Sequence, residues 1–228
     1  SEIKEEPKAG DIRGGEYPIG VSPPLSHLRV PHDNAPFTPL PQNTRPARVV
    51  RMTPETSPDA ARSYAIQMHG DQKYGVHPYV HHLDAVVALL RPYGEQAQVV
   101  GYLHDVVEDT DATVADIAER FGTLVAGCVA LLSDAPGANR KERKARTYAA
   151  MSHVKGEQEL ALTVKAADRL ANVRACVADG HRDLWETYRG EHATFKAAAY
   201  RAGQCDPLWA ELDTLLSDAA APERRPTA

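Results

Sequence analysis

Long apolar runs are absent from this 228-residue chain, so the sequence offers no stretch that could span a membrane. Cysteine is scarce as well, and the 3 cysteines lack metal-ligand spacing. This excludes a disulfide scaffold and a cysteine zinc site, and it favours the reduced thiols of a cytoplasmic protein. An excess of positive charge is also missing, because the formal net charge is -5. Broad electrostatic binding of duplex nucleic acid is therefore not expected.

Alternation of apolar and polar residues, the pattern of a half-buried strand, does not extend over a run of useful length. Helical periodicity dominates from Pro58 onwards instead. The predicted helices span residues 59–69, 82–91, 94–107, 113–120, 124–132, 140–153 and 157–178, with further helix to residue 216. Thr113 and Asn139 are predicted N-caps, and Phe121-Gly122 is a predicted helix stop. We therefore predict an all-α fold.

Proline is concentrated in the N-terminal quarter, where ten of the 17 prolines precede Pro58. Because this segment also has few periodic apolar residues, residues 1–57 are predicted to be a largely irregular leader. Residues 58–218 are predicted to form one helical domain, and residues 219–228 a disordered tail. About 160 residues are enough to bury a sizeable core without disulfides.

The most informative segment is LHDVVEDT, residues 103–110. His104 and Glu108 are four positions apart, as are Asp105 and Asp109, and on a continuous helix such residues lie one above the other. An imidazole and a carboxylate can bind a divalent metal while a carboxylate on the next turn deprotonates a water. The alternative is a solvated acidic face. The flanking apolar residues and the lack of lysine nearby favour a metal site.

Two other segments carry compatible side chains. Upstream, PYVHHL places His81 and His82 at the start of a predicted helix. Downstream, KAADRLAN places Asp168 and Asn172 one turn apart on the same side of another helix. Together, three predicted helices offer imidazoles and carboxylates. This mixed donor set suits a borderline-hard ion such as Mn²⁺, Fe²⁺ or Zn²⁺ and leaves positions for water and phosphate oxygen.

The motifs PYVHHL, LHDVVEDT and KAADRLANVR occur here in the order seen in the HD superfamily of metal-dependent phosphohydrolases. In particular, the chain resembles the hydrolase domain of RelA/SpoT-type proteins and the stand-alone small alarmone hydrolases. The resemblance covers roughly residues 58–216. It implies an HD-domain helical bundle that hydrolyses the 3′-pyrophosphate of alarmone nucleotides, (p)ppGpp or (p)ppApp, and releases pyrophosphate. The segment DAPGANRKERKARTY is similar to stand-alone HD proteins that lack a synthetase domain.

The resemblance also implies roles for individual residues. The implied metal ligands are His82, His104, Asp105 and Asp168. Glu108 and Asp109 match the catalytic acidic pair that activates and orients the attacking water. His81 competes with His82, but the family pattern selects His82, and His81 would point about 100° away around the helix. Mn²⁺ is the expected cofactor, with Zn²⁺, Fe²⁺ and Co²⁺ as alternatives.

The substrate side departs from the family pattern. Asn172 matches a residue near the nucleotide sugar. Where the family commonly has Arg-Lys before its Pro-Tyr, this chain has Lys73 and Tyr74. Tyr74 can stack on a purine and Lys73 can meet a phosphate. The choice between guanine and adenine is therefore left open.

A basic run can supply charge for the far phosphates of the substrate. It has five cations within seven residues: Arg140, Lys141, Arg143, Lys144 and Arg146. Phosphoryl transfer depends on charge neutralisation around the substrate, so Arg140, Lys141 and Arg143 are predicted substrate contacts. The alternative is a solvated helix face, and the sequence leaves both interpretations open.

Two further functions remain open. The same site could act on another nucleotide, NADPH or pyrophosphorylated tRNA. Alternatively, the domain could be a nucleotide-binding sensor or an antitoxin module without turnover, although the intact Glu108 and Asp109 favour an enzyme. The expected partners are a nucleotide substrate and, as further candidates, a tRNA 3′ end or a cognate toxin, but no membrane. The sequence does not predict an oligomeric state.

Overall fold

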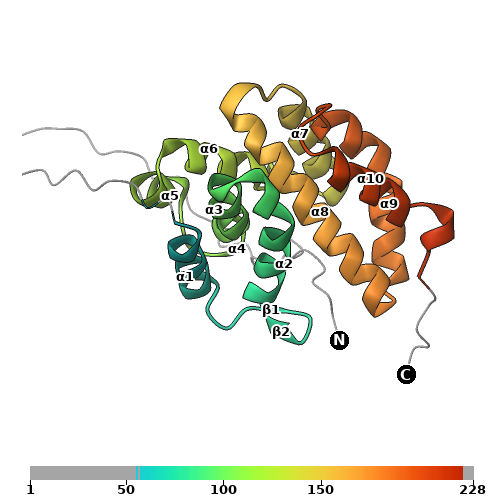
Figure 1. The fold of residues 1–228 in the computed structure, drawn as a ribbon, viewed down its shortest axis with the longest axis horizontal. Coiled ribbons are helices and arrows are strands. Elements are labelled where there is room, and N and C mark those ends of the chain that lie inside the picture. Colours follow the sequence, from blue (N-terminus) through green and yellow to red (C-terminus); the bar gives the residue numbers. More distant parts are fainter. Residues whose placement is uncertain (1–54, 56, 223–228) are drawn as a thin grey trace, which may run out of the picture. The chain divides into compact units, whose positions relative to one another are not determined.

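A bundle of helices brings the three motif segments together (Figure 1). The computed structural model describes residue 55 and residues 57–222. The predicted leader therefore lies outside the described residues, apart from residues 55 and 57. All described residues belong to one compact unit. None of the helices within this described part is both long and apolar enough to cross a bilayer.

The bounds of the elements agree with the predicted helices to within a few residues, except around residue 104. The first half comprises α1 (Pro58–His69), β1 (Lys73–Tyr74), β2 (His77–Pro78), α2 (Val80–Leu90), the 3-10 helix η1 (Arg91–Tyr93), α3 (Glu95–Leu103), α4 (Val106–Asp109), α5 (Val114–Phe121) and α6 (Thr123–Leu132). The second half comprises α7 (Arg140–Ser152), η2 (Gly156–Glu159), α8 (Leu160–Asp179), α9 (Arg182–Ala199), α10 (Asp206–Leu215) and η3 (Asp218–Ala220).

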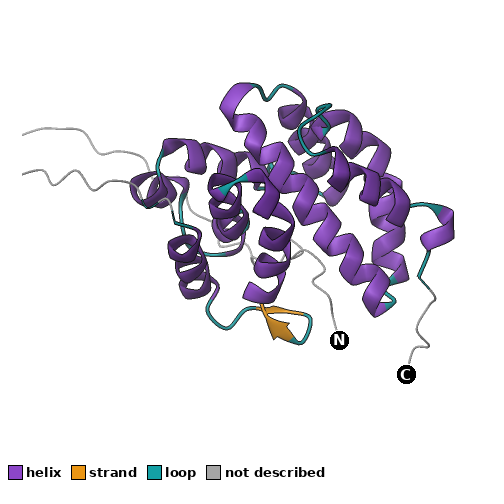
Figure 2. Cartoon of the chain, in the orientation of Figure 1, coloured by secondary structure: helices purple, strands orange, loops and turns teal. Residues whose placement is uncertain are grey.

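The predicted all-α class is confirmed, and Figure 2 shows helices joined by loops, with a single small hairpin among the described residues. In this hairpin β1 and β2 pair antiparallel, with Lys73 opposite Pro78 and Tyr74 opposite His77. The strands are only two residues long, too short to produce a readable alternation in sequence. The hairpin leads directly into α2 and so sets where that helix begins.

Helix α8 forms the centre of the bundle. It contacts α2, α3 and α6 as well as α9 and α10, and Figure 1 shows it running between α2 and the C-terminal helices. Its first fourteen residues are almost all buried, including Lys165, Asp168 and Arg169. Charged groups are retained in such a position only when they are paired or bind an ion. Helix α8 therefore combines core packing with buried charge.

The predicted helix starts and stops are confirmed. Thr113 and Asp116 form a reciprocal capping box at the start of α5, and Gly122 ends that helix with a φ of 93°. Asn139 caps α7, because its Oδ1 accepts a hydrogen bond from the Glu142 N–H at 3.0 Å. These signals were readable because caps depend on residues three or four positions apart.

Aromatic residues of the last third of the chain pack the C-terminal helices onto α8. Trp185, Phe195 and Trp209 are almost completely buried. The Arg169 guanidinium lies 4.5 Å from the ring centre of Tyr188 and 4.8 Å from that of Phe195. This arrangement places the cation of α8 between aromatic faces of α9, where it stabilises packing.

The helical structure continues slightly beyond the predicted end of the domain. Helix η3 spans Asp218–Ala220, and Pro222 is buried. Residues 223–228 lie outside the described part of the chain. The exact domain limits and the character of both ends remain predictions.

Gly101 marks a close approach of α3 to α2. A Cβ atom there would lie 2.5 Å from Leu90 Cδ1 and 3.2 Å from Val87 Cγ2, and both neighbours are buried. We expect Gly101→Ala to reduce the free energy of unfolding by about 1–3 kcal/mol, measured by urea denaturation. The control is Gly190→Ala in α9, where a Cβ would meet nothing within 4 Å, so stability should be kept or raised. Equal stability of the two variants would contradict the packing argument.

Candidate active site

The predicted helix over residues 94–107 is interrupted at the His-Asp pair. Helix α3 ends at Leu103, His104 and Asp105 form a turn, and α4 starts at Val106. The His104 Nδ1 lies 2.8 Å from the Gly101 carbonyl oxygen, an acceptor that a continuing helix would use for its own backbone. The expectation that His104 and Glu108 lie one above the other on one continuous helix is therefore wrong.

The turn directs both side chains towards residues of α2 and α8. The His104 Nε2 lies 3.1 Å from Asp105 Oδ2 and 3.6 Å from Asp168 Oδ1. The His82 Nε2 lies 3.3 Å from Asp168 Oδ1 and 3.9 Å from Asp105 Oδ2. Ligand atoms held about 2.1 Å from one ion are roughly 3 Å apart, so these separations fit a single coordination sphere. The structure thus brings all four predicted metal ligands together.

The His104 imidazole is oriented so that it could act as a ligand of a metal ion. Its side chain is completely buried, its Nδ1 faces a backbone carbonyl, and its Nε2 has no hydrogen-bond partner among the described residues. One ring nitrogen on a carbonyl and the other available to an ion is the arrangement of metal-binding histidines. The donor set of His82, His104 and Asp168, whose ligand atoms lie within 4.8 Å of one another, fits a divalent metal.

The carboxylates determine the charge state of this cluster. Although burial disfavours a charged imidazole, Asp105 and Asp168 raise the pKa of His104 to about 10. Despite its own burial, Asp168 has a pKa held well below the usual range by Lys165 and by the two histidines. A divalent cation would neutralise the same carboxylate charge as a proton on His104, so metal binding and protonation of His104 compete.

Lys165, the first residue of the KAADRLANVR motif, adjoins the candidate site, although no role was predicted for it. Its Nζ is buried, 3.2 Å from Asp168 Oδ2 and 3.5 Å from the Leu132 carbonyl oxygen. Burial opposes its charge, but Asp168, Asp105 and Glu108 together raise its pKa. A lysine three positions before an aspartate on a buried helix is a readable signal for such a pair. Lys165 offsets part of the negative charge around the candidate metal ligands.

Tyr79 is a second residue that was missed. Its hydroxyl donates a hydrogen bond to Asp105 Oδ2, and its ring stacks on His69 with centroids 4.2 Å apart. The side chain is almost fully buried. Because an oriented carboxylate binds metal better than a mobile one, Tyr79 supports Asp105. The tyrosine of the PYVHHL motif was the signal.

The two predicted catalytic acids lie on the short helix α4, beside the cluster. Glu108 is exposed to solvent, and its Oε2 accepts a hydrogen bond from the Asp134 N–H at 3.0 Å. Partial desolvation of this carboxylate raises its pKa, against the opposing charge of Lys165. A carboxylate with a raised pKa is suited to accept a proton near neutral pH. Asp109 is half-buried on the same helix.

Tyr74 and Asn172 adjoin the candidate metal ligands from the other side. The Tyr74 ring stacks on His82 with centroids 4.7 Å apart, and its hydroxyl donates to Asn172 Oδ1 at 2.9 Å. The Asn172 Nδ2 donates to Asp168 Oδ1 at 2.7 Å. Asp168 and Asn172 therefore share one side of α8, as predicted from their spacing. One face of the Tyr74 ring is already covered by His82.

His81 and Lys73 lie outside the group of candidate metal ligands. His81 is exposed and stacks on His77, with ring centroids 4.4 Å apart, while His82 is buried among the candidate ligands. Lys73 is exposed on β1. The pattern-based choice of His82 over His81 agrees with these positions.

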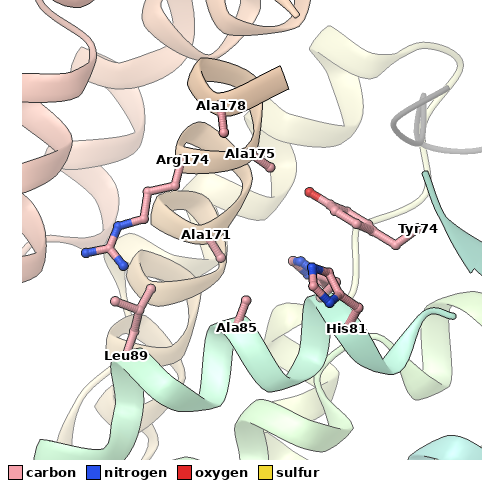
Figure 3. A pocket seen from close by; sticks show the side chains of 9 residues that line it. Tyr74, His81, Ala85, Leu89, Ala171, Arg174, Ala175 and Ala178 are labelled. Atoms are coloured by element: carbon pink, nitrogen blue, oxygen red, sulfur yellow. The ribbon is translucent and has the colours of Figure 1, made fainter. Parts of the chain in front are cut away.

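A cavity of about 230 Å³ opens between α2 and α8, next to Tyr74 (Figure 3). It is lined by Tyr74, His81, His82, Ala85, Leu89, Ala171, Arg174, Ala175 and Ala178. The many alanines leave the space open. The Arg174 guanidinium is held by Glu211 through hydrogen bonds of 2.6 and 2.7 Å. The cavity thus has mostly apolar walls and ends at the imidazole of His82.

The basic run is partly paired within the chain. Arg140 forms an ion pair with Glu191 at 2.8 Å, and Arg143 lies 3.8 Å from Asp134. Lys141 is exposed on α7. Because the charges of both arginines are offset by acids, the exposed lysine is the better candidate for meeting a phosphate. The contact of these residues with substrate remains a prediction.

Comparison with known proteins agrees with this geometry. Residues 60–205 match the family described as HD domain. The chain is 33% identical over 133 residues to guanosine-3′,5′-bis(diphosphate) 3′-pyrophosphohydrolase MESH1 of Danio rerio, covering 55% of this chain and 71% of that protein. It is 32% identical over 126 residues to guanosine-3′,5′-bis(diphosphate) 3′-pyrophosphohydrolase of Aquifex aeolicus, covering 53% of this chain and 18% of that protein.

A probable guanosine-3′,5′-bis(diphosphate) 3′-pyrophosphohydrolase of Synechocystis is 36% identical over 118 residues, 49% of this chain and 15% of that protein. The chain thus spans less than a fifth of the length of these two bacterial relatives. The solved structure of a metazoan SpoT ortholog that hydrolyses ppGpp covers 72% of this chain and 97% of its own, with a TM-score of 0.56 and 23% identity, which supports the fold. The chain therefore belongs to the HD-domain family, in the group that includes the MESH1-type guanosine-3′,5′-bis(diphosphate) 3′-pyrophosphohydrolases.

Proposed function

We propose that this protein is a metal-dependent hydrolase that removes the 3′-pyrophosphate of alarmone nucleotides, (p)ppGpp or (p)ppApp. The observation that carries the proposal is the convergence of His82, His104, Asp105 and Asp168 beside Glu108, a carboxylate with a raised pKa. The relatives named above act on guanosine-3′,5′-bis(diphosphate). The reaction adds water across the bond between the 3′ oxygen and phosphorus, giving pyrophosphate and a free 3′-hydroxyl.

The four converging side chains would hold the metal ion. When bound, a divalent metal supplies Lewis-acid activation of water and neutralises negative charge on phosphoryl oxygens. We propose Mn²⁺ because the set combines two imidazoles with two carboxylates, and Zn²⁺, Fe²⁺ and Co²⁺ are the alternatives for the same donors. Lys165 and Tyr79 hold Asp168 and Asp105 in place through the contacts described above.

Glu108 and Asp109 would act on the attacking water. Glu108 takes its proton, which the raised pKa of this carboxylate favours. Asp109 follows Glu108 on α4 and would orient the same water. The exposed position of Glu108 at the edge of the buried cluster allows the substrate phosphates to approach from solvent. Lys141 on α7 would meet the far phosphates.

The cavity between α2 and α8 would accept the nucleoside. It adjoins the candidate metal ligand His82 and the ring of Tyr74, whose hydroxyl contacts Asn172. Because His82 covers one face of that ring, a base can stack only on the other face. Mostly apolar walls with a few polar groups are the common character of small-molecule sites. Lys73 lies next to Tyr74 on the exposed hairpin and would contact phosphate.

Filling this cavity should weaken nucleotide binding. We expect Ala175→Leu to raise KM for the alarmone by roughly 10- to 100-fold, corresponding to an overpacking cost of about 1–3 kcal/mol, while the metal content stays unchanged. Steady-state kinetics and elemental analysis measure the two effects. The control is Ala150→Leu, the same change at an exposed position of α7. An unchanged KM for Ala175→Leu would place the nucleoside elsewhere.

The proposed function is tested by incubating the protein with Mn²⁺ and either ppGpp or ppApp. The products, pyrophosphate and nucleoside diphosphate, are separated by chromatography, and Glu108→Gln serves as the control. Release of pyrophosphate from either nucleotide, lost in the variant, is the expected result and also reveals the base preference. Turnover of neither nucleotide would contradict the proposal and direct the search to NADPH or pyrophosphorylated tRNA.

A further inference from the structure

The loop between α6 and α7, residues 133–139, directly contacts the candidate catalytic base. The Asp134 N–H donates a hydrogen bond to Glu108 Oε2 at 3.0 Å. Glu108 lies on a helix of only 4 residues, and its exposed side chain would otherwise sample several rotamers. This backbone donor is therefore a constraint on where the Glu108 carboxylate points.

The loop itself is held by the side chain of the same residue. The Asp134 carboxylate is buried and lies 3.0 Å from the Lys144 Nζ, and it also accepts a hydrogen bond from the Thr147 hydroxyl at 3.4 Å. The Thr147 Oγ1 in turn accepts a hydrogen bond from the Ala135 N–H at 3.0 Å. Lys144 and Thr147 are buried residues of α7. The loop is thus fastened to α7 on one side and to Glu108 on the other.

We propose that Asp134 is a positioning residue: its carboxylate, held by Lys144 and Thr147, fixes the loop so that its N–H orients the carboxylate of Glu108. This role rests on the proposed function of Glu108 as the base. It also gives Lys144 a structural purpose within the basic run, namely to anchor Asp134. Preorganised donors are effective because they need not reorganise during the reaction.

The two parts of Asp134 affect Glu108 in opposite directions. Lys165 from α8 lowers the pKa of Glu108, and Asp105 from the turn after α3 raises it. Against this background the Asp134 N–H lowers the pKa of Glu108, whereas the negative charge of Asp134 raises it. Loss of the backbone hydrogen bond and loss of the charge can therefore be distinguished by a pH profile.

The first test is Asp134→Ala in the 228-residue chain. We expect kcat to fall by about 10- to 100-fold because the base is misplaced, with KM and metal content within about twofold of wild type. The acid limb of the kcat profile should move to higher pH, since the freed loop withdraws its N–H from Glu108. If kcat is retained, or if the acid limb moves to lower pH as charge removal alone requires, the proposal is overturned.

Removing Asp134 takes an ion-pair partner from the buried Lys144 and can destabilise the fold. A second variant therefore tests the loop without breaking this ion pair. Thr147→Val keeps the ion pair but removes the hydroxyl that holds the loop. It should lower kcat in the same direction and by a smaller factor, while Asp134→Asn should restore part of the activity lost in Asp134→Ala. Asp213→Ala, which breaks an ion pair with Lys196 on the surface, is the matched control. Full activity of Thr147→Val would contradict the role of the loop.

Nuclear magnetic resonance gives a readout that does not depend on alarmone turnover. In the wild type, the amide proton shift of Asp134 should titrate with Glu108, and this titration should vanish in Glu108→Gln and become smaller in Thr147→Val. If the protein turns over neither alarmone but the coupled titration is seen, the proposed function fails and the positioning role stands. Absence of a Glu108-dependent titration in the wild type would overturn the positioning role itself.

Discussion

Replacing Glu108 with glutamine is expected to lower kcat by about 10²- to 10⁴-fold, the usual contribution of a general base. The metal content should stay unchanged, because Glu108 lies beside the cluster and is not one of its converging ligand atoms. Glutamine keeps the size of the side chain and can still accept the Asp134 N–H, so the fold is preserved. Pyrophosphate release and elemental analysis measure the two quantities. Glu119→Gln, the same change at an exposed position of α5, is the control.

The pH dependence gives this prediction a second measurement. Glu108 must be deprotonated to accept a proton, so activity should be lost as the pH falls through its pKa. Because desolvation raises that pKa above the ordinary glutamate value, the acid limb should lie at higher pH than for an exposed carboxylate. The limb should disappear in Glu108→Gln. A variant that retains wild-type kcat and the same acid limb would remove Glu108 from the mechanism.

Replacing Asp105 with asparagine should abolish both metal binding and turnover, whereas the Glu108 variant should lose turnover and keep its metal. Its Oδ2 lies 3.1 Å from the Nε2 of His104 and 3.9 Å from that of His82, so it faces the same point as both imidazoles. Loss of a direct ligand should reduce metal affinity by more than the roughly 10- to 100-fold typical of outer-shell partners. Elemental analysis after dialysis measures the metal directly.

The control for this experiment is Asp84→Asn. Asp84 forms an ion pair with Arg62 at 2.8 Å and is not part of the converging set, so this variant should keep its metal and its activity. Metal retained at the wild-type level in Asp105→Asn would contradict the ligand assignment. Together with the Glu108 variant, the pair separates residues that hold the metal from residues that act on water.

Much of the fold was predictable because its signals are local. The capping box at Thr113 and the N-cap at Asn139 involve residues three positions apart, so neither required knowledge of the rest of the chain. Helical periodicity located most elements for the same reason. The break at His104 was not predictable in this way, because the hydrogen bond to the Gly101 carbonyl forms as the imidazole turns towards α2 and α8.

The sequence by itself determined the helical class and the identity of the converging residues, because motif order and periodicity are written along the chain. Tertiary structure alone decided their surroundings: the Tyr79 hydroxyl on Asp105, the Tyr74 hydroxyl on Asn172, and the Asp134 N–H on Glu108. In each of these contacts the partners are at least 26 positions apart in the sequence. Their energies depend on burial and distance, which arise only when the helices pack around α8.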